Sequence, residues 1–149
     1  MTVNDANPAT MDPLEFARLV KRTPAGELRR MMHSDQRGAV LDELTTRMPG
    51  VFRADRAGSI DAVVHWVIGD RPDGGADTYE LVIANGACRL SARPDRSPAL
   101  TLTIGAVDFV KLVTGNAHAV ALVMRGKMKT NGDVKLTAKF PTLFDVPKP

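Results

Sequence analysis

The sequence predicts an α+β domain in which a five-stranded, mostly antiparallel sheet is covered on one face by helices. Three observations predict this class. Apolar residues recur at helical spacing up to residue 50, residues 59–104 hold β-branched and alternating segments, and helical spacing returns after residue 107. The 149 residues suit one domain. We place it at residues 11–149, with a flexible segment 1–10, a helical extension 11–35 and a core 36–144.

The N-terminal third is predicted to contain three helices. Asp12-Pro13 supplies an N-cap followed by proline at the first helical position. Thr23-Pro24 ends that helix and begins a second one. We expect Ser34 or Asp35 to cap a third helix, which ends at Pro49-Gly50. Because each helix carries an apolar stripe, the three must pack on another layer.

That layer is a predicted sheet. Residues 59–69 are apolar on both faces and rich in β-branched side chains, which is typical of a central strand. Residues 78–84 and 87–92 alternate between apolar and polar side chains, and Asn85-Gly86 between them favours a type I′ hairpin turn. A fourth strand is expected at residues 100–104.

Two helices are predicted after the fourth strand. The first covers residues 107–114 and ends at Gly115-Asn116. The second covers residues 117–125 and is apolar on nearly all sides, so it must face protein on several sides or face a ligand.

The last part of the chain is predicted to form a fifth strand and a final helix. The strand covers residues 126–130, and Asn131-Gly132 is expected to be the turn that follows it. Asp133 can cap the helix, which Pro141 would kink. An alternating pattern at residues 134–140 also fits a strand, and we favour the helix.

Composition and charge indicate a cytoplasmic protein. The single cysteine, Cys88, excludes an internal disulfide framework. No apolar run is long enough to span a bilayer, and the N-terminus lacks the basic and apolar regions of a secretory signal. The net charge of +3 is unevenly distributed, because residues 111–149 hold seven Lys/Arg and two Asp/Glu. A local basic surface therefore says more about partners than the total does.

The sequence matches no signature of a catalytic or metal site. The three histidines, His33, His65 and His118, fall in different predicted elements without metal-ligand spacing. His65 to Asp70 fits an H-x4-D string found in some acyltransferases, but we interpret it as a strand histidine and a turn aspartate. We interpret Cys88 as a buried hydrophobe and Asp108 as a first-turn helix residue. We expect no enzyme activity, cofactor or metal.

The stretch from Pro98 to Asp133 resembles the sterol carrier protein type-two family of small lipid-binding domains. The resemblance is carried, in order, by the strand at 100–104 and by Asp108, Phe109, Leu112, Gly115, Met124, Gly126, Lys127, Lys129, Gly132 and Asp133. It covers roughly residues 38–144. It implies a five-stranded sheet with helices on one face, an apolar tunnel between them, and a non-enzymatic carrier of sterols, fatty acyl chains, acyl-CoA or phospholipids.

The apolar side chains exceed what a sheet with one helical layer needs, and they either fill a large core or line that tunnel. The expected ligand contacts are Trp66, Leu102, Phe109, Leu112, Val120, Val123, Met124, Leu136, Phe140 and Phe144. Five basic residues are candidates for contact with anionic membrane or a ligand headgroup, against the alternative of a solvated face: Arg125, Lys127, Lys129, Lys135 and Lys139. We expect no nucleic-acid partner, since neither a recognition helix nor a stacking platform is present.

Two functions remain open from the sequence. The first is a carrier that binds an apolar small molecule (a sterol, fatty acid or acyl-CoA) and touches membranes transiently. The second is an interaction module with a closed cavity that serves as an accessory subunit to a lipid-metabolising enzyme, docking through the N-terminal helices near Arg29 and Arg30.

Overall fold

The structure is a computed structural model that describes residues 1–149. It has seven α-helices, at Pro13–Lys21 (α1), Ala25–Met32 (α2), Arg37–Arg47 (α3), Ala54–Ala57 (α4), Ala106–Val113 (α5), Ala119–Met124 (α6) and Val134–Lys139 (α7). The five strands are Ala62–Ile68 (β1), Asp77–Ala84 (β2), Ala87–Leu90 (β3), Leu100–Ile104 (β4) and Met128–Gly132 (β5). Short 3-10 segments lie at Val3–Asp5, Met48–Val51 and Phe140–Leu143.

The five strands form one mixed sheet in the order β3-β2-β1-β4-β5. The predicted central strand is central, since β1 pairs antiparallel with β2 and parallel with β4. The other two pairs, β2 with β3 and β4 with β5, are antiparallel. The hairpin between β2 and β3 has positive φ at both Asn85 and Gly86, as a type I′ turn requires.

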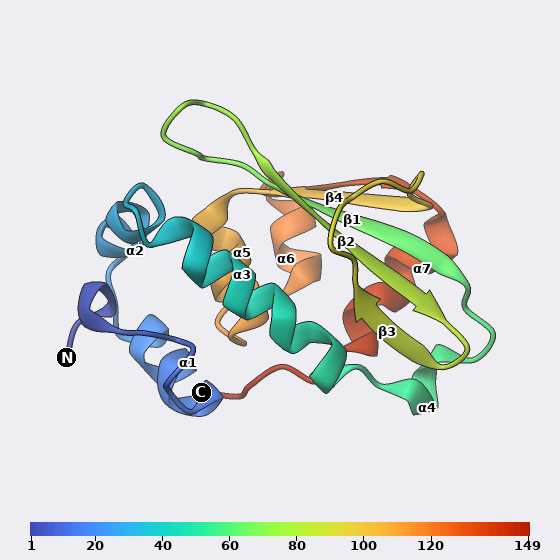
Figure 1. Cartoon of the computed structure of the whole chain (residues 1–149), viewed down its shortest axis with the longest axis horizontal. Helices are drawn as coiled ribbons and strands as arrows, with labels where there is room; N and C mark the ends of the chain where they lie inside the picture. Colours follow the sequence, from blue (N-terminus) through green and yellow to red (C-terminus); the bar gives the residue numbers. More distant parts are fainter.

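All the helices that contact the sheet lie on one side of it, as Figure 1 shows. The face turned toward them carries the buried side chains of alternate strand positions, Val64, Trp66, Ile68, Leu81, Ile83, Leu100, Leu102 and Ile104. These residues join the apolar faces of the helices in one core. The sheet and its helical cover therefore confirm the predicted α+β fold.

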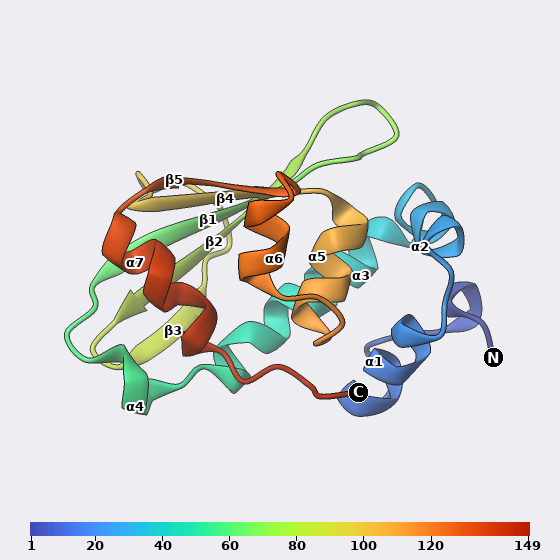
Figure 2. The same ribbon diagram turned by 180° about the vertical axis from the view of Figure 1, so that it is seen from behind.

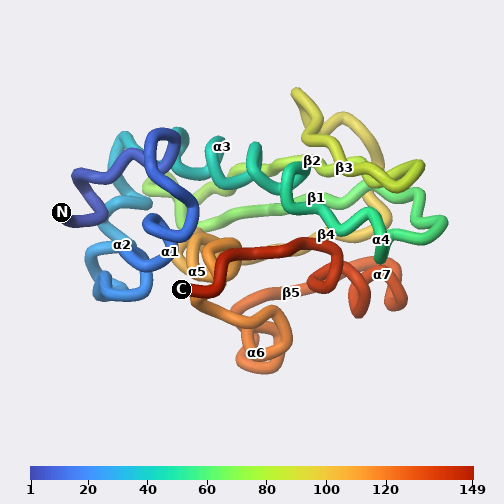
Figure 3. Tube along the Cα trace, turned by 90° about the horizontal axis from the view of Figure 1, so that it is seen from below, coloured from blue at the N-terminus to red at the C-terminus, as the bar shows by residue number.

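The two N-terminal helices α1 and α2 lie beyond one end of the sheet (Figure 3). The predicted N-cap of α1 is confirmed, because the Asp12 carboxylate accepts hydrogen bonds from the backbone N–H groups of Leu14 and Glu15. The C-terminal segment returns from α7 toward α1, as Figure 2 shows, where the Lys21 ammonium donates to the carbonyl of Pro149. Val3 is fully buried, and the flexibility expected for residues 1–10 stays a prediction.

The predicted cap of the third helix is wrong. The N-cap of α3 is Gln36, and its side chain makes no capping bond. Ser34 is engaged elsewhere, because its hydroxyl donates to the carbonyl of Met31 at the end of α2 and accepts from the backbone N–H of Gln36. A serine between two closely spaced helices can thus close the first rather than open the second.

The end of the chain is helical, as we favoured. The Asp133 carboxylate accepts a hydrogen bond from the N–H of Leu136 and caps α7. The α-helix ends at Lys139, and Pro141 lies in the 3-10 turn that follows. Proline lacks the N–H that would continue the α-helical pattern, so the chain tightens there instead of kinking.

The predicted turn at Asn131-Gly132 is also wrong, because both residues belong to β5. Gly132 pairs with Leu100 and adopts a φ of 130°. A Cβ atom there would overlap the carbonyl oxygen of Ala99, and that oxygen accepts a hydrogen bond from the N–H of Asp133. The glycine serves a close backbone approach rather than a hairpin turn.

Gly132→Ala is therefore expected to destabilise the protein by about 2 kcal/mol, because the new methyl group forces the edge strand away from β4 at an unfavourable φ. Chemical denaturation measures this loss. Gly126→Ala is the matched control, since Gly126 also has a positive φ but has open space around it. Equal losses for the two variants would show that φ, and not the contact with Ala99, sets the effect.

Candidate functional site

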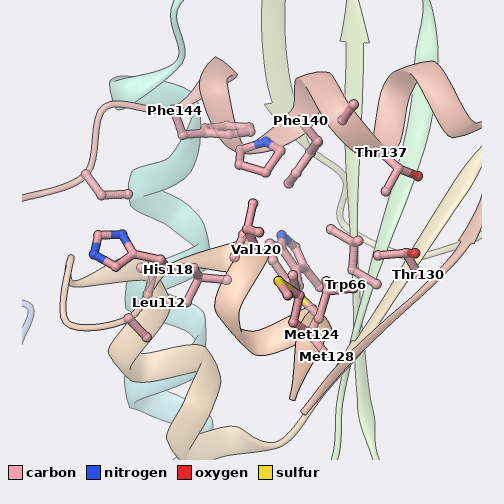
Figure 4. Close-up of a pocket in the computed structure, with 18 of the residues that line it drawn as sticks. Trp66, Leu112, His118, Val120, Met124, Met128, Thr130, Thr137, Phe140 and Phe144 are labelled. Atoms are coloured by element: carbon pink, nitrogen blue, oxygen red, sulfur yellow. The ribbon is translucent and has the colours of Figure 1, made fainter. Parts of the chain in front are cut away.

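An apolar pocket of about 370 Å³ opens between α6 and α7. Of the 19 residues that line it, 15 are hydrophobic. We call it the ligand pocket. Its floor is the sheet, through Trp66 and Leu102, and Figure 4 shows the side chains of α6 and α7 facing each other across it. A pocket of this size and composition is typical of small-molecule binding sites.

Each wall of the ligand pocket comes from a different segment. Leu112 and Val113 at the end of α5 close one end, and Met128 and Thr130 of β5 continue the sheet floor. The wall opposite α6 comes from α7 and from the 3-10 turn that contains Phe140. The ring of Trp66 makes edge-to-face contacts with the rings of Phe109 and Phe140, whose centroids lie 5.1 and 5.8 Å, respectively, from its own. This aromatic stack fixes the pocket floor.

Helix α6 leaves much of its apolar surface uncovered. Leu122 is its one buried residue, while Val120 is 69% exposed and Met124 is 82% exposed. We expected a helix this apolar to face protein on several sides or to face a ligand. The exposed side chains line the ligand pocket, so α6 is a partly uncovered wall at its mouth. Neighbouring exposed apolar side chains of this kind mark binding surfaces.

Few polar groups face the ligand pocket. The indole N–H of Trp66 is buried and has no hydrogen-bond partner. The hydroxyls of Thr130 and Thr137 also belong to the lining, and Thr137 donates to the backbone carbonyl of Asp133. His118 lies in the turn before α6, at the end of the pocket (Figure 4). The lining can therefore hold an apolar body and contact a few oxygen atoms of a ligand.

Eight of the ten residues that the sequence predicts as ligand contacts lie together around this pocket: Trp66, Leu102, Leu112, Val120, Val123, Met124, Phe140 and Phe144. Phe109 and Leu136 do not line it, because both are buried in the core behind its walls. The other 11 lining residues were not predicted from the sequence, and they include Met48, Val113 and Met128. Met48 follows α3, far from the C-terminal helices in sequence, and no local pattern places it beside them.

The five predicted basic contacts are all exposed, but the structure does not gather them on one surface. Arg125 and Lys127 lie after α6, on the side that faces α2 and α5. Lys129 alternates with the pocket residues Met128 and Thr130 along β5, so it points to the opposite face of the sheet. Lys135 and Lys139 lie one turn apart on α7.

The residues with catalytic chemistry do not form a reactive cluster. No group of three or more His, Cys, Asp or Glu side chains could hold a metal ion. His65 lies on β1, and its Nε2 contacts Glu80 Oε1 on β2 at 3.0 Å rather than Asp70, which lies in the following turn. Cys88 is half-buried, and burial raises the pKa of its thiol to about 11, which disfavours the nucleophilic thiolate.

Glu80 is a buried carboxylate on the sheet face that has no helices. Its Oε1 accepts hydrogen bonds from His65 Nε2 and from the backbone N–H of Arg96 at 2.9 Å, so it ties the loop before β4 to the sheet. Burial alone raises the pKa of Glu80. Three groups act in the opposite direction: the Ser91 hydroxyl, which has no well-aligned partner, the His65 ring and the backbone N–H of Arg96. Together they outweigh burial and hold the pKa of Glu80 below its ordinary value.

A carboxylate with a lowered pKa in the folded state stabilises the protein above its unfolded-state pKa of 4.5, and this contribution disappears as the pH falls through the folded-state value. Glu80→Gln should therefore cost about 1–2 kcal/mol at pH 7, and the difference from the parent protein should shrink below pH 4.5. Urea denaturation at pH 7 and at lower pH measures it. Glu15→Gln, at an exposed position, is the control. If the stability difference between Glu80→Gln and the parent protein did not change with pH, the lowered pKa of Glu80 would be contradicted.

Comparison with known proteins places the chain in a family. The model of the SCP-2 sterol transfer family matches residues 43–145, which include the sheet, all the residues that line the ligand pocket except Val146, and all five predicted basic contacts. A comparison with curated protein sequences finds no match.

Solved structures share the fold. A double mutant of the sec-alkyl sulfatase PisA1, an enzyme from Pseudomonas sp., has a TM-score of 0.56 at 19% identity. The likeness covers 81% of this chain and 18% of that one, so this chain spans less than a fifth of the enzyme. Sterol Carrier Protein 2 Like 2 from Aedes aegypti has a TM-score of 0.53 at 17% identity, covering 72% of this chain and 94% of that one.

A second structure of the mosquito protein, in its palmitated form, has a TM-score of 0.53 at 16% identity and covers 74% of this chain and 96% of that one. At these identities the likeness shows the fold, and the match over residues 43–145 shows the family. The chain belongs to the SCP-2 sterol transfer family.

Proposed function

We propose that this protein is a non-enzymatic lipid carrier that holds a sterol, a fatty acyl chain or a similar apolar molecule in the ligand pocket. The observation that carries the proposal is the pocket itself, with 15 hydrophobic residues among its 19 and an apolar wall, α6, that the rest of the chain leaves uncovered. The palmitated mosquito protein supports an acyl ligand.

The expected affinity suits a carrier. Burial of an acyl chain contributes about 0.8 kcal/mol per methylene, so ten carbons contribute roughly 8 kcal/mol before association costs. Those costs amount to at least about 4 kcal/mol, which leaves a ten-carbon chain with a Kd of about a millimolar or weaker. A chain of about sixteen carbons contributes roughly 5 kcal/mol more, which brings the Kd towards a micromolar. Such a complex forms readily and also releases its ligand to an acceptor.

Ligand exchange would take place at a membrane. Val120, Val123 and Met124 present apolar side chains at the pocket mouth, and Arg125 and Lys127 follow them directly. Each basic residue near an anionic surface contributes about 1 kcal/mol to binding. A cytoplasmic protein with this surface could dock transiently through α6. No helix is long and apolar enough to cross a bilayer.

A second candidate is an accessory module for an enzyme of lipid metabolism. The likeness to part of the alkylsulfatase favours it, because there the same fold forms a fraction of an enzyme chain. In that role α1 and α2, which precede the residues matched by the family, would supply the docking surface near Arg29 and Arg30.

Native mass spectrometry of the freshly purified protein, followed by organic extraction, tests the proposal. A bound mass that extracts as a lipid is the expected result. Titration with palmitic acid supplies a second measurement, because Trp66 is the single tryptophan and lines the pocket, so its fluorescence should change on binding. A ligand-free mass together with unchanged fluorescence would contradict the carrier and favour the accessory module.

A further inference from the structure

A second pocket, of about 540 Å³, lies on the other side of α6, between that helix, α2 and α5. We call it the basic pocket. Arg29 enters it from α2, Lys111 from α5, and Arg125 and Lys127 from the end of α6. None of these four side chains forms an ion pair, whereas six other ion pairs exist in the protein. Four unpaired cations around one concave surface create a strong local positive potential.

Acidic groups only partly balance this charge. Asp70 and Asp108 also line the basic pocket, so two negative charges face four positive ones. The floor consists of the buried side chains of Met32, Ala106 and Leu122, which makes the pocket a basic rim around an apolar base. Arginine and lysine at such a rim match the charge and oxygen geometry of a phosphate group.

The basic pocket adjoins the ligand pocket. Ala117 and His118, in the turn between α5 and α6, line both of them. Along α6 the two faces separate, because Val120, Val123 and Met124 face the ligand pocket while Ala121, Leu122 and Arg125 face the basic pocket. Helix α6 therefore divides an apolar compartment from a basic one, and the two meet at its N-terminal end.

We propose that the basic pocket binds a phosphate group. The phosphate is either the end of an amphiphile whose chain occupies the ligand pocket, which rests on the proposed carrier function, or part of a small soluble compound. Arg29 comes from α2, outside the residues matched by the family. The N-terminal helical segment thus completes the site, which gives this extension a role in ligand selection.

Dodecyl phosphate, dodecanol and pyrophosphate distinguish the sources. Calorimetry should show dodecyl phosphate binding about tenfold more tightly than dodecanol, since a charge-assisted contact is worth at least that factor. Arg29→Ala combined with Arg125→Ala should remove this advantage. Both arginines are exposed and their side chains make no hydrogen bonds within the protein, so folding should be unaffected. Arg18→Ala with Arg30→Ala removes two exposed arginines outside both pockets and should keep the advantage.

Pyrophosphate tests the soluble source. If it binds the parent protein and Val120→Asp equally but not the Arg29/Arg125 double variant, the phosphate site accepts a soluble compound. If neither dodecyl ligand binds while pyrophosphate does, the phosphate site stands and the carrier function fails. Equal binding of dodecyl phosphate and dodecanol, without binding of pyrophosphate, would overturn the phosphate site and leave the carrier function intact. The phosphate site would also be overturned if the Arg29/Arg125 and Arg18/Arg30 double variants lost the advantage of dodecyl phosphate over dodecanol to the same extent.

Discussion

Arg37→Met is expected to lower the free energy of unfolding by about 3 kcal/mol, although the new side chain keeps much of the original volume. Arg37 is the first residue of α3 and is 5% exposed. Its Nε donates to the Asp77 carboxylate at 3.0 Å, and its Nη2 donates to the carbonyls of Ile68 and Gly69 at 2.9 Å each. One side chain thus fastens the start of α3 to the end of β1 and the beginning of β2.

The loss of stability should be large because the acceptors that Arg37 contacts remain in the variant without their donor. Methionine offers no donor, so the Ile68 carbonyl loses its contact with the guanidinium in a buried environment. Asp77 is about one-third exposed and retains an ion pair with Arg71 at 3.2 Å, which keeps the cost at the lower end of the range for broken buried pairs.

Urea denaturation at pH 7 measures the effect of Arg37→Met. Arg18→Met, an exposed arginine on α1, is the control and should change stability by less than about 0.5 kcal/mol. Arg37→Lys should fall between the two, because an ammonium cannot reach three acceptors in a fork. If Arg37→Met matched the control, the contacts at the start of α3 would contribute no net stability.

Arg37 also illustrates what the sequence could not predict. An arginine after Ser34, Asp35 and Gln36 reads as a solvated residue in a polar turn, and its burial depends on strands 30 to 40 positions further along the chain. Glu80 is similar, because it alternates with apolar neighbours as an outward strand residue should, yet the loop before β4 covers it. Charged residues give no local signal of burial, since burial requires partners that folding supplies.

Local sequence patterns predicted the structure correctly where a few adjacent residues determine it. The cap at Asp12, the hairpin at Asn85-Gly86 and the cap at Asp133 were predicted because each depends on a few adjacent residues. Gly132 shows the limit of such reasoning, since the glycine of the Asn-Gly pair there serves a close approach to Ala99, the residue before β4. The parallel pairing of β1 with β4 likewise follows from tertiary packing and not from either strand's pattern.

The ligand pocket was partly predictable because one of its walls, α6, has an unusual local sequence. Helix α6 is apolar on nearly every side, and this excess is visible in the sequence without a structure. The assignment of Phe109 and Leu136 to the pocket required knowing which face of each helix meets the core, and helical periodicity alone does not give the direction of the pocket. Composition therefore indicated an excess of apolar side chains, which fits either a pocket or a larger core, and packing decided which residues line the pocket.

Val120→Asp is expected to weaken binding of palmitic acid and dodecanol at least tenfold while leaving the melting temperature nearly unchanged. Val120 lines the ligand pocket and is 69% exposed in the protein without ligand, so a carboxylate there remains solvated and folding is little affected. A bound acyl chain would cover the same position. The carboxylate would then lose water without gaining a partner, which costs more than the 1.4 kcal/mol that a tenfold change represents.

Val134→Asp is the matched control, because Val134 is 82% exposed on α7 and does not line the pocket. It makes the same chemical change at a similarly exposed apolar position. The two variants should have similar melting temperatures, and only Val120→Asp should lose the change in Trp66 fluorescence on titration. Because Trp66 lies on the pocket floor, this signal reports occupancy of the pocket itself. Equal binding by both variants would place the lipid elsewhere and remove the basis for α6 as the entrance.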